Sequence, residues 1–157
     1  MGRYLTHKGG YIMLEYIWLS ITAWFMGFFP LFEIYLAIPS TMALGLDMVS
    51  SIVWSGLGTF IAIPFIVYFF DFLSRIQFMK RFLLKMAQSK YSEKIRKNSF
   101  WFILLATPIV GTWTIGVIGK LTDMNKHSLF LVSAISITIY GILIGILTQL
   151  GIDFITR

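Results

Sequence analysis

Glu33 is the residue whose type and position point most clearly to chemistry in this sequence. It lies three residues after Pro30, inside a long apolar stretch, and a carboxyl group at membrane depth is costly and usually functional. A group that gains and loses a proton there would suit a proton-coupled exporter, because a proton and a cationic substrate would compete for one carboxylate. The alternative is a structural role, in which Glu33 caps a half-helix by accepting hydrogen bonds from its free backbone N–H groups.

A second polar group follows Gly111, where Thr112, Trp113 and Thr114 place two hydroxyls and an indole in consecutive positions. Trp113 would either stack on a cationic substrate or anchor the chain at a membrane interface. We predict that the two groups meet in one cavity near the middle of the membrane. The predicted proton and substrate site consists of Glu33, Tyr35, Pro39, Gly111, Thr112, Trp113 and Thr114.

The composition places these residues in an integral membrane protein. The chain has 157 residues, of which 57% are hydrophobic and 13% are charged, and its mean hydropathy is +0.80. A soluble domain carries about a quarter charged residues, and a small one could not bury this much apolar surface. The composition therefore excludes soluble enzymes and nucleic-acid-binding proteins.

Other catalytic chemistry finds no support in the sequence. Without cysteine there is no thiol nucleophile, thiolate metal site or disulfide, and His7 and His127 flank separate apolar segments. The sequence has no Ser, His and Asp set of credible placement, no paired carboxylates and no glycine-rich phosphate loop. We therefore expect no enzymatic activity, no metal and no cofactor.

Stretches without charged side chains predict where the chain crosses the membrane. Residues 48–70 and 127–152 each exceed the roughly 20 residues that a spanning helix needs. Residues 11–46 are too long for one span and too short for two, and residues 99–122 repeat this pattern. We predict two broken or re-entrant helical hairpins there, because proline removes a backbone donor and disfavours helix at the preceding residue. The predicted breaks or hinges are Pro30, Pro64 and Pro108, with a further cut at Pro39 and the first tip at residues 27–34.

A weak internal repeat relates the two halves of the chain. Segment 43–48 closes the first broken region and segment 119–124 closes the second, each with Asp-Met, and a long apolar helix follows each. The predicted fold is an all-α membrane protein of two inverted repeats, in which discontinuous helices build a midplane site. The alternative is a plain bundle of four spanning helices. The predicted divisions of this single domain are a tail (1–10), a first repeat (11–71), a linker (72–98) and a second repeat (99–157).

The linker between the two repeats carries most of the positive charge. Eight of the 13 Lys and Arg residues lie between positions 75 and 97, which is the positive-inside pattern of a cytoplasmic loop. Apolar residues recur at helical spacing in the linker, which predicts a basic amphipathic helix on the membrane surface. A solvated loop without a lipid role is the alternative. The predicted lipid head-group contacts are Arg75, Lys80, Arg81 and Lys85.

Three segments, in order along the chain, resemble the motifs of the small multidrug export proteins, a family of prokaryotic membrane proteins. Residues 30–39 resemble the family motif Pro-x-x-Glu-x-Arg-x-Ala-Ile-Pro. Gly58 with Pro64 and Phe65 resembles the next block, and residues 108–114 resemble a second-half motif of proline, a glycine-rich turn and Ala-Trp-Thr. The matched blocks and their spacing cover nearly the whole chain.

This resemblance implies an exporter in a prokaryotic cytoplasmic membrane, with lipids and a small-molecule substrate as partners. Tyr35 stands where the family has arginine, so Glu33 has no neighbouring cation and must be protonated, solvated or hydrogen-bonded. The chain also resembles the DedA-type membrane proteins, which implies translocation of a phosphorylated lipid carrier as an alternative function. A non-transporting scaffold is the third interpretation. A homodimer is also expected, because one copy has few helices with which to enclose a pathway.

Overall fold

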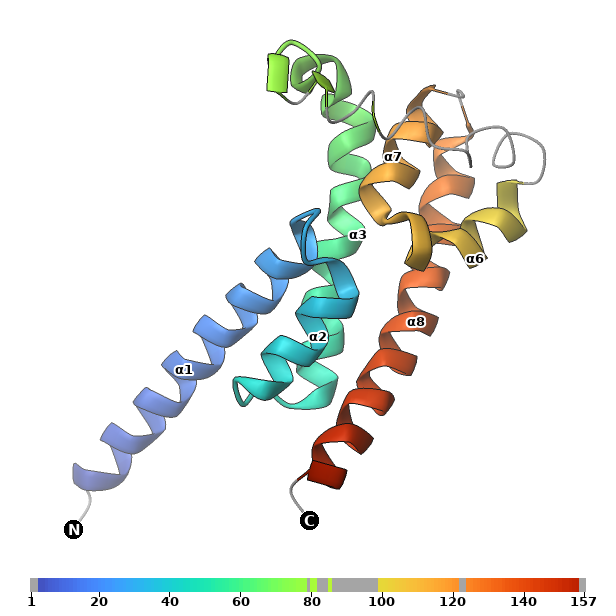
Figure 1. The fold of residues 1–157 in the computed structure, drawn as a ribbon. Helices are drawn as coiled ribbons and strands as arrows, with labels where there is room; N and C mark the ends of the chain where they lie inside the picture. The colour runs from blue at the N-terminus through green and yellow to red at the C-terminus, as the bar shows by residue number, and fades with distance from the viewer. Residues whose placement is uncertain (1–2, 79, 82–84, 86–98, 122–123, 156–157) are drawn as a thin grey trace.

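A computed structural model describes residues 3–78, 80–81, 85, 99–121 and 124–155 of the chain (Figure 1). Within these residues the chain forms helices joined by short turns, and no strand occurs, so the predicted all-α class is confirmed. The principal helices are α1 (Arg3–Phe28), α2 (Glu33–Ala43), α3 (Met48–Leu73), α6 (Ser99–Val110), α7 (Thr112–Leu121) and α8 (Lys126–Ile155).

Helices α3 and α8 are long and apolar enough to cross a membrane. Asp47 caps α3 by accepting a hydrogen bond from the Ser50 N–H at 2.9 Å, and Asn125 caps α8 by accepting from the His127 N–H at 3.0 Å. Such caps satisfy backbone donors that have no partner inside the helix. Both predicted spans are confirmed as continuous apolar helices, and they run in opposite directions (Figure 1).

Each half of the chain places a helical hairpin before its long helix. Helix α1 ends at Phe28 and α2 begins at Glu33, so the first break falls at the predicted tip, and Gly111 separates α6 from α7. In Figure 1 the α1–α2 hairpin opens toward the end of the molecule that carries both termini, and the α6–α7 hairpin opens toward the opposite end. The tips of the two hairpins meet beside the middle of α3 and α8 (Figure 1).

The structure differs from the sequence-based expectations at three prolines and at the N-terminus. Pro30 lies in the first break as predicted, but Pro39 lies inside α2, Pro64 inside α3 and Pro108 inside α6. A proline removes one helical hydrogen bond, and the packing of these helices against their neighbours outweighs that loss. Residues 3–10, predicted to form a tail, belong to α1.

Helix α1 crosses α3 at a pair of glycines. A Cβ atom at Gly27 would overlap the Ser55 carbonyl oxygen, and a Cβ atom at Gly58 would overlap the Trp24 carbonyl oxygen. Thr59 Oγ1 donates to the Gly27 carbonyl at 3.0 Å across the same crossing. Small residues of this kind let two helices approach closely inside a membrane. The crossing therefore fixes the first hairpin against α3.

Helix α7 is enclosed by other parts of the protein. Every residue from Thr112 to Gly119 is buried, and the helix packs against α3, α6 and α8. Ile115 and Ile118 join the main apolar core, whereas Trp113 packs in a second cluster on α3. A short helix that is apolar all round is stable only when it is buried, so α7 depends on its neighbours.

The turns that precede α3 and α8 share one hydrogen-bonding pattern at a constant spacing in the sequence. The N–H groups of Leu46 and Met124, 78 residues apart, each donate to the carbonyl five residues earlier, at 3.0 and 3.1 Å. The caps Asp47 and Asn125 are also 78 residues apart. The sequence similarity pairs Asp47 with Asp123, which lies outside the described residues. In the structure, Asp47 therefore corresponds to Asn125, which lies two residues after its partner in the sequence alignment, Asp123.

Most of the predicted basic linker, residues 72–98, lies outside the described residues, so its amphipathic character stays a prediction. Helix α3 extends into its first two positions and ends at Leu73. The four cations proposed to contact lipid head groups are all exposed: Arg75, Lys80, Arg81 and Lys85.

Candidate functional site

The first hairpin tip presents a buried carboxyl group. The chain turns at residues 29–32 and continues as α2, with the Glu33 N–H donating to the Phe29 carbonyl at 3.2 Å. Glu33 is 7% exposed and has a φ of 43°, the one positive φ of a non-glycine residue in the described part of the chain. A left-handed backbone costs such a residue about 1–2 kcal/mol. Contacts elsewhere must therefore hold Glu33 in this conformation.

The second hairpin tip provides the space that this carboxyl group fills. Gly111 has a φ of 88° and lies 78 residues after Glu33, the same spacing as the two helix caps. A Cβ atom at Gly111 would lie 2.6 Å from Glu33 Oε1 and 3.1 Å from Glu33 Oε2. Both the backbone conformation and the close approach of the carboxyl group therefore require glycine.

The Glu33 carboxyl group lies at the N-terminus of α7 and accepts a hydrogen bond from the Thr112 N–H. The first N–H groups of a helix have no partner within it, and the positive end of the helix dipole favours an anion there. The Tyr35 hydroxyl donates to Glu33 Oε2 over a longer distance of 3.4 Å. Glu33 is thus both a buried carboxyl group and a helix cap, although the helix it caps belongs to the other hairpin.

The second tip contacts the first in return through Trp113. Its indole Nε1 donates to the Phe28 carbonyl at 2.8 Å, and its ring meets the Phe28 ring edge-on with 5.9 Å between centroids. Phe28 is the last residue of α1, and the final carbonyls of a helix have no helical partners. Unsatisfied backbone groups are costly where water is excluded. Each broken helix is therefore completed by the opposite hairpin.

A cavity of about 10 Å³ adjoins the Glu33 carboxyl group, which is roughly the room that one water molecule needs. The Thr112 hydroxyl faces it, buried and without a hydrogen-bond partner among the described residues. The hydroxyls of Thr107 and Ser136 also line it, and each donates to a backbone carbonyl of α6. The full lining comprises Glu33, Ile34, Tyr35, Thr107, Thr112, Ser136, Ile137 and Tyr140.

The structure brings together part of the site that was predicted from the sequence. The residues that meet at the junction are Glu33, Tyr35, Gly111 and Thr112. Trp113 lies beside them and is buried, with 5% of its side chain exposed. Pro39 and Thr114 do not line the cavity. The roles of all these residues in binding a proton or a substrate stay predictions.

Sequence reasoning missed three hydroxyl-bearing residues of the cavity: Thr107, Ser136 and Tyr140. Ser136 and Tyr140 are four residues apart and therefore share one face of α8. That spacing is a usable signal, but α8 carries several other Ser and Thr residues, so the sequence could not single these two out.

Among the described residues that line this cavity, only Glu33 carries a charged group. Lys120 and Asp71 form an ion pair at 3.8 Å near the ends of α7 and α3, away from the junction. In the described part of the chain, no group of three His, Asp or Glu side chains could hold a metal ion. The junction therefore offers one ionisable carboxyl group among hydroxyls and backbone amides.

Comparison with known proteins places these features in a family. A family model described as "Putative small multi-drug export protein" matches residues 33–143, which include Glu33, the second hairpin tip and the whole of α3. No curated protein sequence and no solved structure matches the chain. The resemblance to the export family is thereby confirmed, and the resemblance to DedA-type proteins stays a prediction. The chain belongs to the family described as "Putative small multi-drug export protein".

Proposed function

We propose that this protein is a proton-coupled membrane exporter of small amphipathic or cationic compounds, with Glu33 as its proton site. The family description names drug export, and α3 and α8 are long and apolar enough to span a membrane. The observation that carries the proposal is the contact between the buried Glu33 carboxyl group and the N-terminus of α7.

Protonation of Glu33 would weaken the contact between the two hairpin tips. An ionised carboxylate is a stronger hydrogen-bond acceptor than a neutral acid, and the ionised form gains more from the positive end of α7. The tips are therefore held together when Glu33 is ionised and loosened when it carries a proton. A proton that arrives from one side of the membrane and leaves to the other would drive this change once in each transport cycle.

A cationic substrate would act on the same carboxylate. Glu33 is the one charged residue among the described residues that line the adjoining cavity, so a cation that reaches the junction would pair with its carboxylate. Proton and cation would therefore compete, and the release of one would favour the binding of the other. Such competition couples substrate export to proton entry.

We further propose that the chain is an inverted repeat with re-entrant hairpins. Three observations support it: the opposite directions of α3 and α8 (Figure 1), the 78 residues between Asp47 and Asn125, and the same spacing between Glu33 and Gly111. In transporters of this architecture, one repeat rocks against the other around a site formed by broken helices. The junction of the tips would be that site.

Translocation of a phosphorylated lipid carrier is the alternative proposal. It would use the N-terminus of α7 to bind a phosphate, but the Glu33 carboxyl group already lies there and, when ionised, would repel an anion. The exporter is therefore the better supported of the two. A non-transporting scaffold would need neither the carboxyl group nor its protonation.

The proposed setting is a prokaryotic cytoplasmic membrane. The basic residues of the linker would face the cytoplasm, where exposed cations such as Arg75 and Lys80 would contact anionic lipid head groups. A homodimer would complete the enclosure of the pathway.

Substrate-driven proton flux in proteoliposomes tests the proposal. The protein, Glu33→Gln and Glu15→Gln are reconstituted at equal density, and the internal pH is followed by a fluorescent dye after a lipophilic cation is added. Glu15 is an exposed glutamate on α1 and serves as the matched control. We expect Glu33→Gln to reduce the flux by roughly tenfold or more, because glutamine cannot exchange a proton. Glu15→Gln should retain the native flux.

Thermal denaturation of the same three proteins separates function from folding. The side chain introduced by Glu33→Gln would keep an acceptor oxygen for the Thr112 N–H, so a melting temperature near that of the native protein is expected. Native flux in Glu33→Gln would refute proton coupling at this site and favour the scaffold or the lipid-carrier interpretation.

A further inference from the structure

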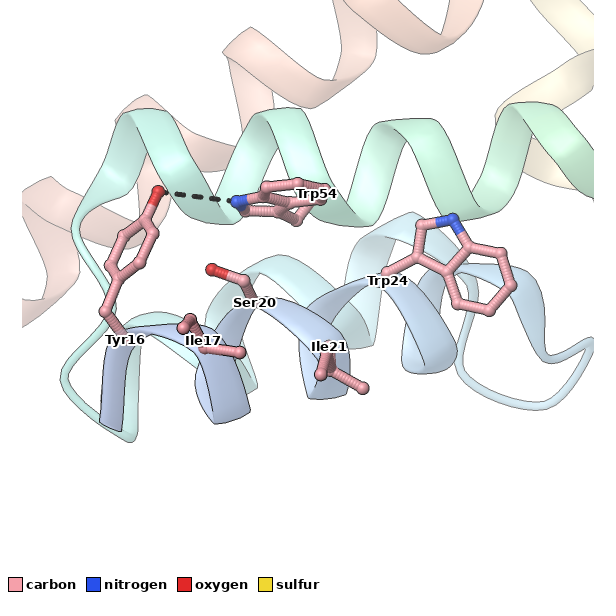
Figure 2. A pocket seen from close by; sticks show the side chains of 6 residues that line it. All are labelled: Tyr16, Ile17, Ser20, Ile21, Trp24 and Trp54. Atoms are coloured by element: carbon pink, nitrogen blue, oxygen red, sulfur yellow. Dashed lines mark hydrogen bonds between the residues drawn. The ribbon is translucent and has the colours of Figure 1, made fainter. Parts of the chain in front are cut away.

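A groove runs along the outer side of the crossing between α1 and α3 (Figure 2). Its volume is about 410 Å³, within the range of sites that bind small organic molecules. Five of its lining residues lie on one face of α1 and the sixth projects from α3: Tyr16, Ile17, Ser20, Ile21, Trp24 and Trp54. This groove lies apart from the cavity beside Glu33 and shares no lining residue with it.

Hydrogen bonds hold the aromatic rings at one end of the groove. The Trp54 indole Nε1 donates to the Tyr16 hydroxyl at 3.4 Å (Figure 2), and the same hydroxyl pairs with Ser50 Oγ at 3.1 Å. The Ser20 hydroxyl points toward this end, and Ile17 and Ile21 on α1 contribute apolar lining (Figure 2). The faces of tyrosine and tryptophan rings attract cations within about 6 Å. None of the six lining residues is basic.

A carboxylate lies beyond the same end. Ser50, which bonds the Tyr16 hydroxyl, also donates its N–H to Asp47 Oδ1 at 2.9 Å. Asp47 is exposed, and Ser50 links its carboxylate to the Tyr16 hydroxyl through these two hydrogen bonds. One end of the groove therefore combines two electron-rich rings with a nearby negative charge, and the remainder is apolar.

The other end of the groove approaches the junction of the hairpin tips. The Trp24 ring stacks on the Phe28 ring, with 5.5 Å between centroids and 7° between planes. Phe28 in turn meets Trp113, the residue through which the second tip contacts the first. A molecule in the groove would therefore touch an aromatic side chain that packs directly against the junction.

We propose that this groove binds an amphipathic organic cation, with its apolar rings along Ile17 and Ile21 and its charge between Tyr16, Trp54 and Asp47. The charge distribution favours this occupant over a lipid acyl chain, which would gain nothing from the carboxylate or from the electron-rich ring faces. The proposal deepens the proposed export function by naming a substrate-binding site, and it rests on that function for the class of substrate. Binding can be measured without transport.

Equilibrium binding of tetraphenylphosphonium to the full-length protein in nanodiscs of neutral lipid tests the site, with neutral triphenylphosphine oxide as the comparison. Asp47→Asn removes the charge but leaves an asparagine, which caps helices as well as aspartate does. Trp54→Ala removes a ring, and Trp18→Ala, at a 63% exposed position of α1 outside the groove, is its matched control.

We expect Trp54→Ala to weaken binding of the cation about tenfold and Asp47→Asn to weaken it about threefold to fivefold. Trp18→Ala should bind the cation with native affinity. The affinity for the neutral compound should be lower and should not change in Asp47→Asn. Equal affinity for the two compounds, together with no effect of Asp47→Asn, would overturn the proposal and identify the groove as an apolar surface filled by lipid.

The failure of this proposal can be distinguished from the failure of proton coupling. In a Glu33→Gln background, which lacks proton flux and the second carboxylate that could hold a cation, Trp54→Ala should still weaken binding of tetraphenylphosphonium about tenfold relative to Trp18→Ala. Native binding without any proton flux, even in the unmodified protein, would leave the groove in place and refute the exporter mechanism. If proton flux depends on Glu33 but Trp54→Ala and Asp47→Asn bind tetraphenylphosphonium with native affinity, only the groove proposal is refuted.

Discussion

The first hairpin resumes its helix at Glu33 with a φ of 43°, whereas the second resumes its helix after Gly111 with a φ of 88°. Glycine adopts positive φ without strain, and glutamate does not. The strained tip carries the buried carboxyl group, and the relaxed tip carries no side chain in the place where that carboxyl group lies. The position of the Glu33 carboxyl group therefore depends on the absence of a side chain at Gly111.

The two tips also differ in the backbone group that each presents to the opposite hairpin. The first tip ends α1 and therefore has free carbonyls, one of which accepts from the Trp113 indole. The second tip begins α7 and therefore has free N–H groups, one of which donates to Glu33. Trp113 thus donates to the first hairpin and Glu33 accepts from the second, so each hairpin satisfies a backbone group of the other.

A side chain at the second tip should destabilise the protein most. We expect Gly111→Ala to lower the free energy of unfolding by about 3 kcal/mol, because its Cβ atom would meet Glu33 Oε1 at 2.6 Å and its φ is positive. Gly45→Ala is the matched control, since Gly45 has a φ of 105° with open space around it. It should cost about 1 kcal/mol, measured for both variants by denaturation in mixed micelles.

A Glu33→Ala background tests whether the cost of Gly111→Ala comes from the contact with the Glu33 carboxyl group. In a Glu33→Ala background the clash is absent, so Gly111→Ala should cost no more than Gly45→Ala does. Equal costs of the two glycine substitutions in the native background would contradict a close contact between the tips.

Loss of the returning hydrogen bond should have a smaller effect. Trp113→Phe keeps an aromatic ring but leaves the Phe28 carbonyl without its donor, which should lower the free energy of unfolding by about 1–2 kcal/mol. Trp18→Phe, at a 63% exposed position on α1, should change it little. A stability of Trp113→Phe equal to that of Trp18→Phe would show that the indole nitrogen does not join the tips.

The smallest expected effect is a difference in how the stability of the turns before α3 and α8 depends on pH. Hydrogen bonds from the Ser50 hydroxyl and N–H hold the pKa of Asp47 below its usual range, whereas the equivalent cap, Asn125, does not ionise. Because the pKa of Asp47 is lower in the folded state, its contribution is complete above the unfolded-state pKa and disappears as the pH falls through the folded-state pKa.

Melting temperatures of Asp47→Ala and Asn125→Ala between neutral and acidic pH check this difference. We expect each substitution to cost about 1 kcal/mol at neutral pH. The cost of Asp47→Ala should shrink in acid and that of Asn125→Ala should stay constant. A pH-independent cost at both turns would mean that the charge of Asp47 does not contribute to its cap.

The elements of this fold were largely predictable from residues close together in the sequence. Long runs without charge predict α3 and α8, and Pro30 marks the first tip, because hydropathy and proline geometry act locally. Pro39, Pro64 and Pro108 lie inside helices and do not break them, since a helix packed against neighbours tolerates the loss of one hydrogen bond. A hinge role for these prolines stays a prediction. The residues expected to form a tail are helical for a reason that the local composition does not reveal.

Residue types alone indicate an apolar, helical chain that is interrupted at two places and has a carboxyl group at the first interruption. Each of these properties depends on residue types and on neighbours within a few turns of helix. Only the tertiary structure decided that Glu33 caps α7, a helix that begins 79 residues later, and that Trp113 completes α1. Those partners follow from how the two hairpins pack against α3 and α8, because contacts between distant segments depend on the whole arrangement of helices.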